Sequence, residues 1–482
     1  GIELEDDLVV HARPGKDNSM KSLYAVGFVT LGAYFWGANP MQAHNPIVQT
    51  LYTADPAPMV HDGTLYVYAS HDEHTDSNFF TMRDWHLFST TDLVNWTAHG
   101  AVASLNDLKW MDRDNGAWAP HCVERNGKFY LYVPIHGEGI GVLVADSPFG
   151  PFKDPLGRRF IQSANIWDDI DPTVLLDDEG RAYLYWGNPK LMYVRLNEDM
   201  ISYDTSIGDQ GIVYVEMTSD AFGERAEKSD KYTTNYEEGP WLWKGNGQYY
   251  LFFAAGGIPE VIAYSTAPTA TGPWSYRGVV MDRHPGLSFT NHSGVVEFKG
   301  RALFFYHNET LPGGGGFNRS VCVEDLCFNP DGSVAPIIPT VGGIQEAIGT
   351  LSPYSRVEAE TMAWSEGIQL ASDEKIGVYV TDLDDGDYIK LRNVAFAQGA
   401  RRFEVHASAP EGSAGSIEIR IGGKDGELLG MCHIKSTASE GEWGAHSCQV
   451  SRVEGVHDLY LVFTGGKGSS IGVDWWSFET PD

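Results

Sequence analysis

The sequence predicts an all-β protein, a five-bladed β-propeller followed by a β-sandwich. A short pattern, a turn glycine followed by aromatic and β-branched residues, recurs five times along the chain. A strand-like segment precedes each of these glycines, so each copy predicts a β-hairpin. After the last copy the chain changes to short alternating strands with glycine-rich turns, which are typical of a sandwich. No helical periodicity extends beyond a turn or two.

The five copies predict five blades. They read DGTLYVYAS, NGKFYLYVP, EGRAYLYWG, NGQYYLFFA and KGRALFFYH, with the turn glycines at Gly63, Gly127, Gly180, Gly247 and Gly300. Asn-Gly and Asp-Gly pairs favour tight hairpin turns because glycine adopts φ > 0 without steric cost. Strand-built repeats of about 50 residues are typical of propeller blades.

The register of the hairpins predicts where an active site lies. The inner strands of all blades start at the same end of the central channel, so equivalent positions on them should converge. Eight or nine positions before the turn glycines stand, in order, Asp55, Trp118, Asp171, Glu238 and His292. Three carboxyl groups, one aromatic ring and one imidazole at a single mouth predict a catalytic site.

The chain divides into three parts. Residues 1–44 are a polar leader followed by a stretch similar to a secretory signal, with a lysine, an apolar segment and small residues. We therefore expect a secreted or periplasmic protein, with the cytoplasm as the alternative if the stretch packs on the propeller. Residues 45–345 carry the repeats. A Gly- and Pro-containing linker precedes the predicted sandwich, residues 346–482.

Composition narrows the class of partner. The net charge of −31 argues against nucleic acid and anionic membranes, and it fits a neutral substrate or simply a solvated acidic surface. The 14 Trp, 23 Tyr and 22 Phe suit both β structure and sugar stacking. The five cysteines carry no zinc signature. Cys322 with Cys327 and Cys432 with Cys448 form disulfides only in an exported protein; otherwise they stay free.

Three of the converging residues suit glycoside hydrolysis, which needs two carboxyl groups flanking the scissile bond. Asp55 lies in TADPAP, Asp171 in DIDPTV and Glu238 in YEEGPW. An aspartate before proline is usually a turn residue when taken singly. The shared register of the three favours catalysis instead. Glu237, the neighbour of Glu238, should point to the opposite face of its strand.

Residues 45–345 resemble family 43 glycoside hydrolases, on the motifs TADPAP, SHDE, NWTAHG, WAPH, ADSPFGPF, DIDPTV, EEGPW and NHSG in that order. The resemblance implies a five-bladed propeller that inverts the anomeric centre by single displacement. It implies Asp55 as general base, Glu238 as general acid and Asp171 as the group that modulates their pKa values. It also implies that Trp118 and Arg319 (in GFNRSV) bind substrate, and that His292 lies near a calcium ion in the channel, directly or through water.

Residues 346–482 resemble family 6 carbohydrate-binding modules, on RVEAETM, DDGDYIKL, GVHDLYLVF and GVDWWSF. The resemblance implies a structural calcium ion held by Glu358, Glu360 and Asp474. The sugar cleft departs from the family pattern, because His446 stands near the place of a second tryptophan. The sequence leaves two roles for this sandwich: it binds sugar, or it only braces the propeller.

Our leading hypothesis is an exo-acting, inverting β-xylosidase/α-L-arabinofuranosidase that releases terminal xylose or arabinofuranose from xylan- or arabinoxylan-derived oligosaccharides. The first alternative is an arabinoxylan arabinofuranohydrolase that debranches the polymer, with the sandwich holding the chain. An endo-arabinanase fits less well. A non-catalytic propeller lectin is the rival from another class, and the three carboxyl groups argue against it. A hydrolase that uses calcium as a Lewis acid is disfavoured.

Overall fold

The computed structural model describes residues 44–482, apart from 76, 411–412, 437–441, 466–470 and 482. The predicted leader and signal-like stretch lie, except for His44, outside the described residues. In the described part of the chain, the helices are α1 (Ser219–Phe222) and two 3-10 turns (Leu105–Asp107 and Ile166–Asp168), and the rest is strands and loops. The prediction of an all-β chain is confirmed. No described helix is long and apolar enough to cross a membrane.

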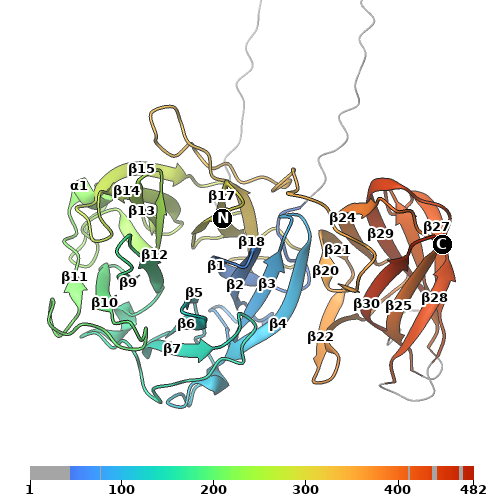
Figure 1. Ribbon diagram of the computed structural model, residues 1–482. Helices are drawn as coiled ribbons and strands as arrows, with labels where there is room; N and C mark the ends of the chain where they lie inside the picture. Colours follow the sequence, from blue (N-terminus) through green and yellow to red (C-terminus); the bar gives the residue numbers. More distant parts are fainter. Residues whose placement is uncertain (1–43, 76, 411–412, 437–441, 466–470, 482) are drawn as a thin grey trace, which may run out of the picture. The chain divides into compact units, whose positions relative to one another are not determined.

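Residues 53–325 form five antiparallel sheets that follow one another around a common centre (Figure 1). The first sheet consists of β1 (Thr53–His61), β2 (Thr64–His71), β3 (Asp84–Thr90), β4 (Trp96–Ser104) and the later strand β20 (Thr361–Met362). The second consists of β5 (His121–Arg125), β6 (Lys128–Ile135) and β7 (Gly139–Ala145). The third consists of β8 (Thr173–Leu176), β9 (Ala182–Trp186), β10 (Met192–Leu196) and β11 (Val213–Tyr214). The fourth consists of β12 (Tyr236–Gly245), β13 (Gln248–Ala255), β14 (Val261–Ala267) and β15 (Ser275–Met281), and the fifth of β16 (Gly294–Phe298), β17 (Arg301–Asn308) and β18 (Ser320–Asp325).

The first strands of the five sheets contact one another in cyclic order. β1 contacts β5, β5 contacts β8, β8 contacts β12, β12 contacts β16, and β16 returns to β1. Residues at the start of these strands therefore gather around one axis. This cycle is the physical reason why residues far apart in the sequence meet in one site.

All five predicted hairpins form, and their turns follow from the sequence. In four of them the two turn residues, such as Asn126 and Gly127, both have positive φ. This is the geometry of the type I′ turn that matches the twist of the flanking strands. The third hairpin is the exception. Its longer turn places only Gly180 at positive φ, and Asp177 N–H donates to Arg181 O across it.

Large apolar side chains fill the space within and between these sheets. Tyr68, Leu131, Phe252 and Phe304, from four different sheets, are fully buried in one continuous core cluster. This arrangement follows from the sequence pattern, because strands covered on both faces are near-continuous apolar runs rather than alternating ones. The core therefore fixes the sheets against one another through the middle of their second strands.

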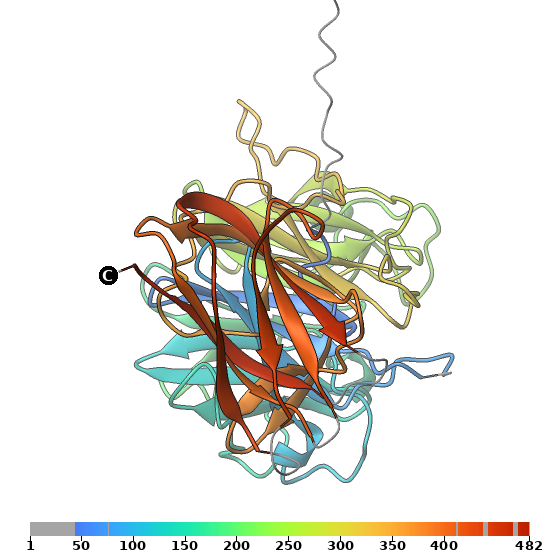
Figure 2. The ribbon, with the colours of Figure 1, turned by 90° about the vertical axis from the view of Figure 1, so that its right-hand side faces the viewer.

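The chain from residue 357 onward forms two further sheets, drawn orange to red in Figure 2. One contains β22 (Gln369–Asp373), β23 (Gly377–Thr381), β30 (Gly472–Glu479), β25 (Arg402–Ser408) and β28 (Gly444–Gln449), with β19 (Val357–Glu358) beside β30. The other contains β21 (Trp364–Glu366), β24 (Tyr388–Phe396), β29 (Gly455–Gly465), β26 (Gly415–Ile421) and β27 (Glu427–Ile434). Their inner faces share a core that includes Phe403, Ile417 and Trp476. The expected short alternating strands are all present.

The chain returns to the first sheet after the linker. Thr361 and Met362 pair with Thr97 and Trp96 of β4. Nearby, the amide of Asn95 donates to Arg392 O at 2.9 Å and accepts from Arg392 N at 2.8 Å. Asn95 Nδ2 also donates to Asp92 Oδ2 at 2.6 Å, so the buried amide has protein partners on both its nitrogen and its oxygen.

Candidate active site

One pocket brings together all the residues that the sequence predicts for the catalytic part. Asp55, Trp118, Asp171, Glu238, His292 and Arg319 all line it. They come from the starts of the first strands and from the segment before β18. The convergence expected from hairpin register is therefore present in the structure. The other lining residues are Phe80, Met82, Ile170, Thr290 and Asn291.

The backbone is bent where the carboxyl groups stand. Asp55 and Asp171 have φ of 54° and 57°, and Glu238 precedes Gly239, which has φ of 58°. Left-handed φ in a non-glycine residue is strained by about 1–3 kcal/mol, and such strain concentrates at functional sites. A Cβ at Gly239 would lie 3.2 Å from Nδ1 of His292, so a side chain there would require the imidazole to shift.

Asp55 is held as a carboxylate. Ser70 Oγ donates to its Oδ2 at 2.6 Å and Arg319 Nη1 donates to its Oδ1 at 3.1 Å. Burial raises the pKa of Asp55, but the positive charge of Arg319 and the hydrogen bond from Ser70 outweigh burial and bring the pKa below its usual value. Asp55 is therefore ionised at neutral pH and can accept a proton.

Arg319 is anchored from the other side by Asp72. Its Nε and backbone N–H both donate to Oδ2 of Asp72 at 2.9 Å, and Nη2 donates to Oδ1 at 2.9 Å. The carboxylate of Asp72 is fully buried, and the ring of Phe80 lies 4.5 Å from the guanidinium. Burial would lower the pKa of Arg319, but Asp55 and Asp72 together raise it. The guanidinium therefore remains a fixed positive charge beside Asp55.

The imidazole of His307 is neutral and contacts the backbone of Asp55. Its Nε2 lies 2.8 Å from Thr290 O, and its Nδ1 lies 3.3 Å from the backbone N–H of Asp55. This pattern requires Nε2 to carry the proton and Nδ1 to accept. Burial and Arg319 lower the pKa of His307 to about 3, so the imidazole carries no charge at working pH.

Asp171 and Glu238 experience the opposite electrostatic environment. Gly239 N–H donates to Oδ2 of Asp171 at 2.9 Å. Burial, then the charges of Glu238 and Asp55, raise the pKa of Asp171 well above its usual value. Burial also raises the pKa of Glu238, although an amide hydrogen bond from Asn188 opposes the rise. One pocket thus holds an ionised acid and two whose protonated forms are favoured.

Glu237 behaves as the sequence predicts. Its carboxylate turns away from the pocket and pairs with Arg225 at 2.5 Å, whereas Glu238 lines the pocket. The alternation of side chains along a strand separates the two neighbours. Of these two glutamates, Glu238 is therefore the one placed to reach a substrate.

Sequence reasoning missed four residues that shape this site: Ser70, Asp72, Asn188 and Glu260. A signal existed for the first two, because SHDE spans positions 70–73 and was part of the family resemblance. Asn188 follows β9 and Glu260 precedes β14, each beside a proline. Those two segments carry no repeat pattern, so only the three-dimensional structure associates them with Glu238.

Aromatic rings form one side of the pocket and its rim. The rings of Trp118 and His136 are stacked with centroids 4.0 Å apart, and Trp167 meets His136 edge-on at 5.1 Å. Phe79 and Trp167 are among the most exposed large apolar side chains, at 47% and 58%. Exposed aromatic faces beside a polar pocket suit stacking against sugar rings.

Polar atoms of the pocket lack partners. Trp118 Nε1, Thr290 Oγ1 and Asn291 Oδ1 are buried and make no hydrogen bond with the described residues. Buried polar atoms are normally paired, so such atoms in a pocket indicate a ligand with matching donors and acceptors. A molecule rich in hydroxyl groups meets this requirement.

The predicted calcium ligands differ in how well they are prepared. His292 is buried, and burial lowers its pKa, so the neutral imidazole can bind a cation. In the sandwich, Arg356 binds both Glu358 at 2.7 Å and Asp474 at 3.1 Å. Glu360 has a buried Oε2 without a partner, and burial together with Glu358 raises its pKa to about 9. The carboxyl set suits calcium chemically, and Glu360 has an orphaned oxygen that a cation would satisfy.

A different group of possible metal-ligating side chains lies close together. In the described part of the chain, the one group of three His, Cys, Asp or Glu side chains whose ligand atoms lie within 4.8 Å of one another is His71, Asp84 and His86. Oδ1 of Asp84 lies 2.9 Å from His71 Nδ1 and 3.3 Å from His86 Nε2. The group is satisfied by its own contacts, and it braces the strand end between Ser70 and Asp72.

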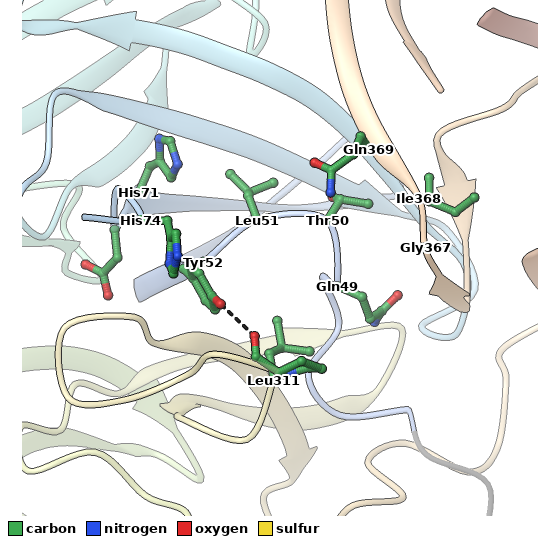
Figure 3. A pocket seen from close by; sticks show the side chains of 12 residues that line it. Gln49, Thr50, Leu51, Tyr52, His71, His74, Leu311, Gly367, Ile368 and Gln369 are labelled. Carbon is green, nitrogen blue, oxygen red and sulfur yellow. Dashed lines mark hydrogen bonds between the residues drawn. The ribbon is translucent and has the colours of Figure 1, made fainter. Parts of the chain in front are cut away.

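A larger cavity lies elsewhere in the described part of the chain. It has a volume of about 620 Å³ and lies between Gln49–Tyr52 and residues 367–369 (Figure 3). The hydroxyl of Tyr52 donates to Pro312 O at 2.6 Å on its wall. The only acidic side chain that lines it, Asp72, is occupied by Arg319. This cavity lacks the two carboxyl groups that hydrolysis needs, so the smaller pocket is the catalytic candidate.

Comparison with known families assigns both regions. The family described as "Glycosyl hydrolases family 43" matches residues 43–334. The family described as "Carbohydrate binding module (family 6)" matches residues 358–480. Both matches agree with the resemblances seen in the sequence.

Individual relatives cover either both regions or the first one. The arabinoxylan arabinofuranohydrolase of Bacillus subtilis (strain 168) is 32% identical, over 95% of this chain and 96% of its own. The xylosidase/arabinosidase 43A of Humicola insolens is 32% identical over 60% of this chain and 98% of its own. The crystal structure of a family 43 arabinoxylan arabinofuranohydrolase from Bacillus subtilis, in complex with cellotetraose, superposes with a TM-score of 0.78 at 30% identity, covering 91% of this chain and 98% of that one.

Proposed function

The chain belongs to glycosyl hydrolase family 43 and carries a family 6 carbohydrate-binding module, and on this premise we propose that it releases terminal arabinofuranose or xylose from arabinoxylan or its oligosaccharides. The observation that carries the proposal is the pocket in which Asp55, Asp171 and Glu238 meet with opposite pKa shifts. An ionised carboxylate and a protonated carboxyl group beside one substrate are the two reagents of glycoside hydrolysis.

The reaction proceeds by a single displacement. Asp55 acts as the general base and takes a proton from the water that attacks the anomeric carbon. Glu238 acts as the general acid and gives its proton to the leaving glycosidic oxygen. The bond from that oxygen to the anomeric carbon breaks as the bond to the water oxygen forms, so the configuration inverts.

Asp171 modulates the pair. Burial and the negative charges of Glu238 and Asp55 raise its pKa, so the titration of Asp171 is linked to that of both residues. Arg319 keeps Asp55 ionised, while Trp118 presents an unpaired indole N–H to a sugar hydroxyl. The unpaired oxygens of Thr290 and Asn291 offer further contacts.

The fold supports this assignment in its finer form. We infer that the five sheets are the blades of a five-bladed β-propeller, which the cyclic contacts of their first strands support. We place the catalytic domain at residues 45–345 and the sandwich at 346–482, in agreement with the ranges matched by the two families. Export of the protein, which the signal-like stretch before residue 45 suggests, remains a prediction.

Calcium is proposed at two places. In the pocket, His292 is a neutral, buried nitrogen donor close to Asp55. In the sandwich, Glu360 supplies an unpartnered oxygen, and Glu358 and Asp474 join it once Arg356 turns away. A bound ion would hold these side chains in place and neutralise their repulsion. The chemistry of the reaction is supplied by the carboxyl groups.

Debranching of the intact polymer is the second candidate. It is favoured by the relatives named arabinoxylan arabinofuranohydrolase, which align with both the catalytic region and the module. The exposed rings of Phe79 and Trp167 offer stacking platforms beyond the pocket. The xylosidase/arabinosidase from Humicola insolens, in contrast, aligns with the first part of the chain.

The deciding experiment follows the first-formed anomer by proton NMR during hydrolysis of xylobiose, of an arabinofuranosyl oligosaccharide and of arabinoxylan. We expect the inverted anomer, with arabinofuranose released from the polymer. A retained anomer would contradict single displacement. No turnover of any of the three, with binding intact, would support the lectin alternative.

A further inference from the structure

A fourth buried carboxyl group, Glu260, stands beside the predicted general acid. It lies just before β14, is 1% exposed, and its backbone N–H donates to Phe289 O at 3.0 Å. The carboxyl group of Glu238 is within hydrogen-bonding reach of it. Nothing in the repeat pattern or in the family resemblance pointed to this residue.

The hydrogen bonds of Glu260 indicate which of its two carboxyl oxygens carries a proton. Its Oε2 accepts from the backbone N–H of Asn291 at 2.7 Å, which marks Oε2 as the carbonyl oxygen. Its Oε1 is buried and faces no donor. A buried carboxylate oxygen without a donor is strongly unfavourable. An Oε1 that carries a hydrogen needs an acceptor instead, and the carboxyl group of Glu238 provides one.

The charged groups around Glu260 also favour its protonated form. Three acids face Glu260, namely Glu238, Glu237 and Asp171, and each of them disfavours an ionised Glu260 whenever it is itself ionised. Glu237 is already paired with Arg225, and Arg319 is engaged by Asp55 and Asp72. Burial and Glu238 together raise the pKa of Glu260 well above its usual value. No cation pairs with Glu260 among the residues that the structure describes.

We propose that Glu260 is a protonated carboxylic acid that donates a hydrogen bond to Glu238 and stabilises the carboxylate which Glu238 becomes during the reaction. The inference rests on the proposed role of Glu238 as general acid. When Glu238 gives its proton to the glycosidic oxygen, negative charge develops on Glu238. The hydrogen bond from Glu260 strengthens at that moment, alongside the amide bond from Asn188.

Glu260 is therefore a positioning residue that acts through Glu238 and keeps its own proton throughout. This arrangement resolves a conflict at the site. Burial favours a protonated Glu238, which a general acid requires, but the same burial would disfavour the carboxylate left behind. A neutral donor supports the product state without adding a negative charge to the resting state.

The test compares Glu260→Gln with Glu260→Met. The glutamine variant keeps a neutral donor, so we expect kcat to stay within a few-fold of the unmodified protein and the basic limb of the pH profile to stay in place. The methionine variant loses the donor, so we expect kcat to fall roughly 100-fold, with the basic limb moved to higher pH. An equal loss of kcat in both variants, with equal losses of melting temperature, would mean a structural role and overturn the proposal.

A second readout needs no substrate and so separates this inference from the proposed function. The infrared C=O stretch of protonated carboxylic acids should be present at neutral pH, and Glu260→Gln should remove the part of its intensity that Glu260 contributes. The exposed Glu297 on β16 is the matched control, and Glu297→Gln should leave that band unchanged. Loss of carboxylate bands instead in Glu260→Gln, with the basic limb moved to lower pH, would show that Glu260 is ionised and would overturn the proposal.

Discussion

Two regions of this protein each bring three of the predicted acids together with one arginine, in different surroundings: Asp55, Asp171 and Glu238 with Arg319 in the pocket, and Glu358, Glu360 and Asp474 with Arg356 in the sandwich. In the pocket Arg319 is 5% exposed, and in the sandwich Arg356 is 50% exposed. In the pocket the pKa values of the acids are shifted in opposite directions, with that of Asp55 lowered and that of Glu238 raised. In the sandwich Arg356 pairs with two acids and leaves Glu360 with an orphaned oxygen.

The difference shows that burial and partners, rather than residue type, decide what a carboxyl group does. In the pocket each acid has its own hydrogen-bond donors and charged neighbours, so Asp55 is ionised whereas the protonated forms of Asp171 and Glu238 are favoured. In the sandwich Glu358 and Asp474 share one half-exposed cation, Arg356, and Glu360 is left without a partner for its buried oxygen. The first arrangement suits proton transfer, and the second suits the binding of a cation.

The largest expected effect is on catalysis in the pocket. Asp55→Asn removes the base and Glu238→Gln removes the acid, so we expect kcat to fall roughly 10²- to 10⁴-fold in each. With an activated aryl leaving group, which needs little protonation, Glu238→Gln should recover most of its activity while Asp55→Asn should not. The exposed turn variants Asp178→Asn and Glu179→Gln serve as controls. Equal recovery in both catalytic variants would contradict the assigned roles.

The two arginines offer a matched test of stability. Arg319→Met leaves the fully buried Asp72 without its partner, so we expect a loss of about 3–5 kcal/mol in the free energy of unfolding. Arg356→Met removes a half-exposed ion pair, so we expect a change within about 1 kcal/mol. Urea unfolding measures both. Similar losses in the two variants would show that burial does not distinguish the regions.

The pH dependence of kcat/KM should reflect the divided pocket. Activity needs ionised Asp55 and protonated Glu238. Because the pKa of Asp55 is lowered, the acid limb should lie below the usual range of an aspartate. Because the pKa of Glu238 is raised, the basic limb should lie above that of a glutamate. A narrow profile, with both limbs at the usual carboxyl values, would contradict this electrostatic account.

In the sandwich, a change of pH should alter the stability of the fold rather than the activity. The pKa of Glu360 is raised to about 9, so its folded state favours the proton. Its contribution is present below the usual glutamate pKa and is lost as pH rises toward 9. Glu360→Gln should flatten this loss in thermal melts. Calcium should flatten it in the unmodified protein and have no effect in the variant; an equal calcium effect in both would exclude Glu360 as a ligand.

The smallest effect is expected at the rim. Trp167→Ala removes an exposed ring 5.1 Å from His136, so we expect KM for arabinoxylan to rise by about 2- to 10-fold with kcat unchanged. Short oligosaccharides that fill only the pocket should be hydrolysed as before. A uniform loss on short and long substrates would place Trp167 in the pocket rather than on a platform for the polymer.

Much of the site was predictable because hairpin register is a local property. The turn glycines fix where each first strand ends, and counting back from them selects Asp55, Trp118, Asp171 and Glu238. The separation of Glu238 from Glu237 follows from strand alternation alone. The family resemblance then added Arg319 and the expected roles.

What the sequence could not supply are the partners outside the repeat. Asn188 and Glu260 lie in loops at the ends of β9 and β14, where no periodicity marks them. The pairing of Thr361 with β4, beyond the predicted linker, was equally invisible. These contacts depend on how sheets and loops meet across long distances in the chain, and one sequence carries no direct signal of that.

By itself, the sequence determined the all-β class, the five hairpins and the acids that stand at their starts, because turn glycines and strand alternation act over a few residues. Only the tertiary structure decided which acid is ionised. The cyclic contacts of the first strands bring Arg319 to Asp55 and leave Glu238 beside Glu260 and Asp171. Protonation depends on burial and on neighbouring charges, and both arise from contacts between residues far apart in the chain.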